Sequence, residues 1–176
     1  MDFDSFGNAM PGIHQVNLSE FEEIFVLSFK KSSKREQIYS NFIKFFNLQI
    51  LNKYRTVISK LWIDGSFSTA KVEPNDIDGI IFLKFSNDEE YHLAMEFQEL
   101  HATYFKKLAY EYDCDLYVQF DIDKIPTRNS VNESYSRFYD NVDLYTKYWM
   151  GQFCFDRQQR PKGIFELEFK ESEFYG

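Results

Sequence analysis

The chain has 176 residues, 44% of them hydrophobic, which is enough to bury the core of one domain of ordinary size and argues against intrinsic disorder. Its net charge of −8 argues against a broad nucleic-acid-binding surface, because an acidic protein repels a phosphate backbone. No apolar run approaches the roughly 20 residues that span a bilayer, no secretory signal is recognised and the two cysteines predict no disulfide framework, so we expect a cytoplasmic protein that does not bind membranes.

The first third of the chain predicts two helices after an irregular lead-in. Residues 1–17 show no sustained hydrophobic period. Ser19 is expected to cap a short helix whose first turn is acidic. From Ser33 to about Tyr54 the apolar residues recur every three or four positions, which predicts the first long helix.

Strands and helices alternate through the rest of the chain. Strands are predicted at Val57–Ile63, Asp76–Phe85, Asp115–Asp121 and Lys162–Phe169. Helices are predicted at Asn87–Tyr112 and Asn132–Phe153, the second with room for an interruption. The 19% of aromatic residues could supply platforms for base stacking, but most fall at helical or strand spacing, so we assign nearly all of them to the core. Without repeats or linkers, residues 1–176 are predicted to form a single α+β domain.

The segment between Leu61 and Leu83 carries the chemical signal. A predicted strand runs into Gly65 and Ser66, where a missing Cβ lets the backbone approach a phosphate and the amides and hydroxyl can donate to it. The following residues could begin a helix. Asp76 and Asp78 are two apart on the next predicted strand, so both carboxylates project from one face.

Paired carboxylates repel each other unless a cation lies between them, and Mg²⁺ is the hard, oxygen-seeking ion that suits them. A third carboxylate usually completes such a site. Asp113 and Asp115 both lie on the polar face of the third predicted strand. We favour Asp115, which is expected level with Asp76 and Asp78, and keep Asp113 as the alternative.

Gly65-Ser66, nine residues and then Asp76-Ile77-Asp78 resembles the signature of the DNA polymerase β-like nucleotidyltransferase superfamily. Three segments resemble a small bacterial family of nucleotidyltransferase-like proteins. They are Met10-Pro11-Gly12-Ile13-His14, Trp62–Asp78 and Arg160-Pro161-Lys162-Gly163-Ile164.

The resemblance implies a mixed sheet with helices packed on one side. It also implies that Gly65 and Ser66 contact a nucleoside triphosphate (NTP). Asp76, Asp78 and Asp115 would hold two Mg²⁺ ions. Gly79 departs from the pattern, because such strands usually carry a larger apolar residue there.

Four further residues near the motif have two readings each. Lys71 is a candidate partner of the β- or γ-phosphate, against the alternative of a solvated loop lysine. Arg160 and Lys162 could form a cationic wall for the triphosphate, although exposed basic residues on a hairpin are the commoner explanation. Asp64 is expected to be structural, either pointing away from a pocket lined by Ser66 or capping the following turn.

These observations predict an enzyme that transfers a nucleoside monophosphate from an NTP to an unidentified acceptor with Mg²⁺. The superfamily's acceptors include small molecules, proteins and tRNA. The alternative is a nucleotide-binding partner subunit without turnover, as in a toxin–antitoxin or phage-defence pair. A third reading is an interaction domain in which the motif occurs by chance.

Overall fold

The computed structural model describes residues 2–29, 32–127 and 132–170. Its strands are β1 (Gly12–Val16), β2 (Ile58–Asp64), β3 (Ile77–Leu83), β4 (Cys114–Phe120) and β5 (Gly163–Glu168). They form one mixed sheet in the order β1-β5-β2-β3-β4. β1 pairs parallel with β5 and β3 parallel with β4, whereas β2 is antiparallel to both of its neighbours. The four predicted strands are confirmed to within a residue or two at most ends, and β1 was not predicted.

β1 escaped prediction because its partner lies at the other end of the chain. Gly12 pairs with Gly163, and Ile13 with Ile164, so two of the segments that carried the family resemblance lie side by side. A Cβ on Gly163 would collide with the carbonyl of Met10 and lie 2.6 Å from Nε2 of His14. Only glycine therefore permits this close approach.

The α-helices are α1 (Leu18–Phe25), α2 (Ser33–Phe46), α3 (Asp88–Leu100), α4 (Lys106–Tyr110) and α5 (Glu133–Phe153). Two 3₁₀ segments, η1 (Leu27–Phe29) and η2 (Gln49–Val57), and a π-helical turn, η3 (His101–Phe105), complete the helical elements. The helix predicted to run from residue 33 to 54 therefore ends at Phe46, where Asn47 caps it. The helix predicted over residues 87–112 is continuous but passes through η3, and α5 is uninterrupted.

The predicted cap of the first helix is wrong by two residues. Asn17, not Ser19, precedes α1, and its side chain accepts a hydrogen bond from the backbone N–H of Glu20 at 2.8 Å. The Glu20 carboxylate accepts one in return from the backbone N–H of Asn17. This reciprocal capping box satisfies two amides that the helix itself cannot.

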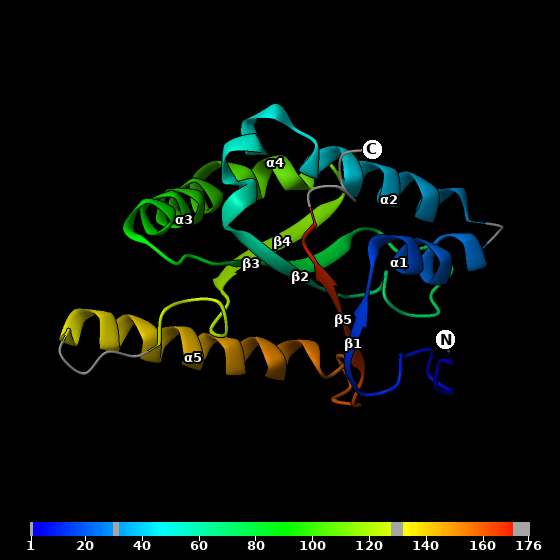
Figure 1. Ribbon diagram of the computed structural model, residues 1–176. Coiled ribbons are helices and arrows are strands. Elements are labelled where there is room, and N and C mark those ends of the chain that lie inside the picture. Colours follow the sequence, from blue (N-terminus) through cyan, green and yellow to red (C-terminus); the bar gives the residue numbers. More distant parts are fainter. Residues whose placement is uncertain (1, 30–31, 128–131, 171–176) are drawn as a thin grey trace.

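Helices cover both faces of the sheet, so the expectation of helices on one side is wrong. Figure 1 shows α5 across the sheet from α1, α2, α3 and α4. The C-terminal part of α5 packs Phe153 and Trp149 against Trp62, Phe82 and Ile164 on its face of the sheet. The larger core on the other face holds most of the buried aromatic rings, as the spacing predicted. Within the residues that the structure describes, no helix has both the length and the apolar character to cross a membrane.

Candidate functional site

Three aspartates lie side by side on adjacent strands. Asp64, the last residue of β2, pairs with Asp78 on β3, and Asp78 pairs with Asp115 on β4. Side chains two apart share a face, and Trp62 and Tyr117 lie on the α5 face of the sheet. The three carboxylates therefore project from that same face at one end of the sheet.

A cavity of about 860 Å³ opens over this row of carboxylates. All of the predicted site residues line it, namely Gly65, Ser66, Lys71, Asp76, Asp78 and Asp115. The tertiary structure thus brings together residues that the sequence separates by up to 50 positions. It adds residues that were not predicted, among them Asp64, Asn8, Asn75 and Asp156.

The turn after β2 requires a glycine at its first position. Gly65 has φ +73°, and a Cβ there would collide with Oδ2 of Asp78 and lie 2.5 Å from its Cγ. The carboxylate of Asp78 therefore lies directly against the Gly65 backbone. Residues 65–70 then form successive turns rather than the helix start considered above, with the Thr69 hydroxyl donating to the Ser66 carbonyl at 2.8 Å.

A buried arginine from α2 holds this turn in place. The guanidinium of Arg35 donates to the carbonyls of Phe67 (2.8 Å), Thr69 (2.8 Å) and Lys71 (2.6 Å), and to Phe25 in α1 (2.8 Å). Burial lowers the pKa of Arg35 to about 10, which still leaves it charged at neutral pH. Nothing in the sequence around Arg35 marked it, because its partners are backbone oxygens far along the chain.

Burial and the charges of neighbouring carboxylates raise the pKa values of Asp78 and Asp76. Burial raises the pKa of Asp78 to about 6, and the charges of Asp76, Asp64 and Asp115 add to the shift. Burial, and then the charge of Asp115, raises the pKa of Asp76 as well. A cluster that resists ionisation in this way is suited to a bound cation, which would relieve the repulsion.

Asp64 and Lys162 form a buried ion pair inside the cavity. Lys162 Nζ lies 2.7 Å from Oδ1 and 2.8 Å from Oδ2 of Asp64, and Lys162 is only 8% exposed. Asp64 therefore lines the cavity and does not point away from it, while its ion pair fits the structural role that was expected. The expectation that Lys162 is an exposed hairpin residue is wrong. Burial raises the pKa of Asp64, against the opposing effect of the Lys162 charge.

Asp113 and Asp115, the two candidates for the third carboxylate, have different surroundings in the structure. Asp113 has φ +56°, and its carboxylate accepts a hydrogen bond from the side chain of Asn41 at 2.8 Å, on the α2 side of the sheet. Asp115 lines the cavity instead. Its buried Oδ1 accepts no hydrogen bond from the described residues, and Lys106 Nζ lies 3.6 Å from it. Geometry therefore favours Asp115 as the third carboxylate.

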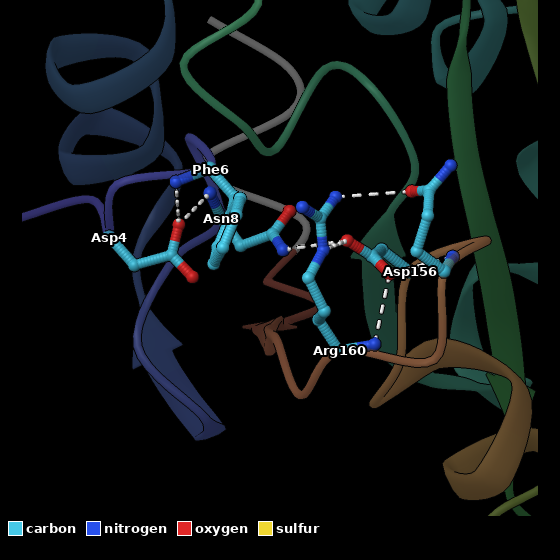
Figure 2. Close-up of polar contacts among 6 residues, drawn as sticks. Asp4, Phe6, Asn8, Asp156 and Arg160 are labelled. Carbon is cyan, nitrogen blue, oxygen red and sulfur yellow. Dashed lines mark hydrogen bonds and ion pairs between the residues drawn. The ribbon is translucent and has the colours of Figure 1, made fainter.

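The N-terminal segment and the turn before β5 close another part of the cavity. Asn8 donates from its side-chain amide to Asp156 at 3.0 Å, and Asp156 also accepts from Arg160 Nε at 2.6 Å, as Figure 2 shows. The Arg160 guanidinium lies 4.0 Å from the centre of the Phe6 ring. Arg160 is thus held by Asp156 at the cavity wall. The sequence did not predict Asn8 as a cavity residue, because its partner Asp156 lies 148 positions further along the chain.

The donor set fits a hard divalent cation. Carboxylate oxygens are the ligands that Mg²⁺ prefers, and Asp76, Asp78 and Asp115 would hold it. Across the described ranges, no three His, Cys, Asp or Glu side chains are already gathered at metal-binding distance. Binding would therefore require these carboxylates to draw closer around the ion.

Comparison with curated proteins and with solved structures gave no match for the chain. A family profile does match, over residues 1–168. The matched region therefore includes the paired strands β1 and β5 and every residue that lines the carboxylate cavity. The chain belongs to this family, which is described as a family of unknown function (DUF6932).

Proposed function

We propose that this protein is a Mg²⁺-dependent nucleotidyltransferase, which transfers a nucleoside monophosphate from an NTP to an acceptor nucleophile. One observation carries the proposal: Asp76, Asp78 and Asp115 line a single cavity together with the Gly65–Ser66 turn. Carboxylates on adjacent strands beside a glycine turn are the arrangement that the superfamily signature implies. The mixed sheet is compatible with that fold, and the helix α5 on the second face is a departure from the expected layering.

Each residue has a role in this reaction. The Ser66 hydroxyl and the backbone amides of the turn would donate to the triphosphate, and Lys71 would neutralise part of its charge. Asp76, Asp78 and Asp115 would hold Mg²⁺, which offsets the charge that develops on the phosphate oxygens. Arg35 fixes the backbone of the turn through the Phe67, Thr69 and Lys71 carbonyls.

The chemical step is a substitution at the α-phosphorus. A hydroxyl oxygen of the acceptor forms the new bond, the bond to the bridging oxygen breaks, and pyrophosphate leaves with the electron pair. The hydroxyl proton passes to a carboxylate of the cluster and then to water. Positioning and electrostatics would supply most of the acceleration, as is general for phosphoryl transfer.

The acceptor is proposed only by class: a small molecule, a protein side chain or a tRNA end. The net charge of −8 disfavours a large nucleic acid, because its phosphates would be repelled outside the metal site.

The test is labelling by NTPs that carry an α-phosphate label, with Mg²⁺ and cell lysate as the source of acceptors. Wild-type protein should label an acceptor, and Asp78→Asn should not. Asp113→Asn is the matched control, because it removes a nearby carboxylate that does not line the cavity, and it should label as wild type does. Equal labelling by wild type and Asp78→Asn would refute the assignment.

A nucleotide-binding partner subunit without turnover is the second candidate. It would use the same glycine turn and the same carboxylates, which line one cavity whether or not turnover follows. In that case NTP and Mg²⁺ would raise the melting temperature of the wild type but not of Asp78→Asn, and no acceptor would be labelled.

A further inference from the structure

The carboxylate cavity has an aromatic wall as well as a charged floor. Tyr148, Trp149 and Phe153, near the C-terminal end of α5, line it, and Phe155 follows them. Most phenylalanines and the other tryptophan are buried in the two cores. Tyr148 is 52% exposed and Phe155 45% exposed, so each presents much of its ring to the cavity or to solvent.

Tyr148 contacts a cluster of packed rings through Trp149. Its ring meets that of Trp149 edge to face, with centroids 5.2 Å apart, and Trp149 packs in turn on Tyr117 (4.6 Å) and Phe153 (5.6 Å). Such a cluster restricts the orientation of the outermost ring, because Trp149 is itself packed between two other rings. An exposed ring whose orientation is restricted can serve as a platform for another flat group.

This wall is continuous with the carboxylate floor. Tyr117, against which Trp149 packs, follows Asp115 by two residues on β4, and its hydroxyl lies 3.5 Å from Asp115 Oδ2. Lys106 Nζ lies 3.7 Å from the centre of the Tyr117 ring and 3.6 Å from Asp115 Oδ1. A ligand that occupies the floor with charged groups can therefore reach the rings with an apolar, planar part.

We propose that Tyr148 is the stacking platform for the base of the bound nucleotide, with Trp149 as the positioning residue beneath it. This inference rests on the proposed function, because it assigns the phosphates to the Gly65–Ser66 end of the same cavity. The exposed Gln152, which also lines the cavity, offers an amide that can both donate to and accept from the edge of a base. Stacking accepts every base, so discrimination between bases is assigned to Gln152 rather than to the ring.

The experiment compares two ligands that differ only in having a nucleoside. Binding of ATP and of inorganic tripolyphosphate, each with Mg²⁺, is measured by titration calorimetry on wild type and three variants. Tyr148→Ala should weaken ATP binding by roughly five- to 150-fold and leave tripolyphosphate binding unchanged, because stacking on one ring has that magnitude. Tyr148→Phe should restore ATP binding, since it keeps the ring.

Tyr145→Ala is the matched control. Tyr145 lies one turn earlier on α5, is 55% exposed and does not line the cavity. The Tyr145→Ala variant should therefore bind both ligands with wild-type affinity. Fluorescence gives a second readout. Trp62 is buried on the sheet, so a change in tryptophan fluorescence on ligand binding should come from Trp149. ATP should quench this fluorescence and tripolyphosphate should not, and the quenching should be lost in Trp149→Phe.

The outcomes separate this inference from the proposed function. If neither ligand binds wild type, the nucleotide site itself is refuted. If both bind wild type but Tyr148→Ala weakens neither or weakens both equally, the platform is refuted while the nucleotide site stands. If Tyr145→Ala weakens ATP binding as much as Tyr148→Ala does, the effect belongs to the whole exposed face of α5, as expected of a protein-docking surface. The base platform is then likewise refuted.

Discussion

The carboxylate of Asp78 occupies the space in which a side chain at residue 65 would lie: a Cβ on Gly65 would be 2.5 Å from Asp78 Cγ. The glycine and the aspartate of the motif are therefore one structural unit, in which the first makes room for the second. The sequence suggested that Gly65 makes room for a phosphate. The structure shows that it first makes room for one of the carboxylates.

Gly65→Ala should disturb the site more than the fold. The positive φ alone costs about 1–3 kcal/mol with an alanine, and the methyl group must also displace the Asp78 carboxylate. We expect a lower free energy of unfolding in urea and loss of Mg²⁺-dependent nucleotide binding. Gly151→Ala is the control, because Gly151 lies in α5 with open space around it, and it should stabilise the protein by about 0.5–1 kcal/mol. Nucleotide binding by Gly65→Ala at the wild-type level would contradict this account.

Asp78 should make the protein less stable as the pH rises. Its pKa in the folded state is about 6, above the ordinary value, so the folded state binds the proton more tightly than the unfolded state. The stabilisation from protonated Asp78 is complete below about pH 4 and is lost as the pH rises through 6. Asp78→Asn should therefore raise the melting temperature at pH 8 and change it little at pH 4. Mg²⁺ affinity of the wild type should rise over the same interval, because the ion requires the ionised carboxylate. A melting-temperature difference that does not vary with pH would argue against the raised pKa.

The Asp64–Lys162 pair should show strong coupling. Lys162→Met leaves the Asp64 carboxylate buried without its partner, which should cost about 3–5 kcal/mol in the free energy of unfolding. The double variant Asp64→Asn/Lys162→Met should cost much less than Lys162→Met alone, because no uncompensated charge remains. Urea denaturation of the full double-mutant cycle measures the coupling. Additive effects of the two substitutions would show that the pair does not form in solution.

Arg35 should support both stability and the nucleotide turn. Arg35→Lys keeps the charge but loses the planar fork that reaches the carbonyls of Phe67, Thr69 and Lys71. Because buried backbone carbonyls are left without a hydrogen-bond donor, we expect the free energy of unfolding to fall by about 3 kcal/mol or more. ATP affinity should fall as well, since the turn is no longer held.

The control for Arg35 is Arg137→Lys on the exposed side of α5. Arg137 forms an exposed ion pair with Glu133, so its substitution should change the free energy of unfolding by less than about 0.5 kcal/mol. Equal effects of the two arginine substitutions would rule out the anchoring role of Arg35.

Local patterns predicted the elements well where the signal was itself local. The strands β2, β3, β4 and β5 were recognised because they are short segments rich in β-branched and aromatic residues, which alternate with polar residues in β5. The break between α2 and η2 was missed because the hydrophobic period continues from Phe46 through Leu51, and periodicity does not show where the backbone changes its helical pitch. β1 was missed because a five-residue strand depends on its partner more than on its own residues.

The faces of the strands were harder to predict than the strands themselves. In β2 nearly every residue is buried, so the alternation that would have placed Asp64 beside Asp78 is absent from the sequence. Strand alternation did not separate Asp113 from Asp115, because they are two positions apart and share a face. Asp115 was favoured only for its expected level with Asp76 and Asp78. The left-handed backbone at Asp113 and its bond to Asn41 turn it away from the cavity.

The sequence by itself determined the order of the elements, the glycine turn and the two aspartates that follow it, because these depend on residues close together in the chain. Only the tertiary structure decided that Asp115 joins them, that Lys162 neutralises Asp64, and that α5 brings an aromatic wall to the same cavity. The physical reason is strand pairing: register and crossing are fixed by burial and hydrogen bonds between segments far apart, which no local pattern encodes.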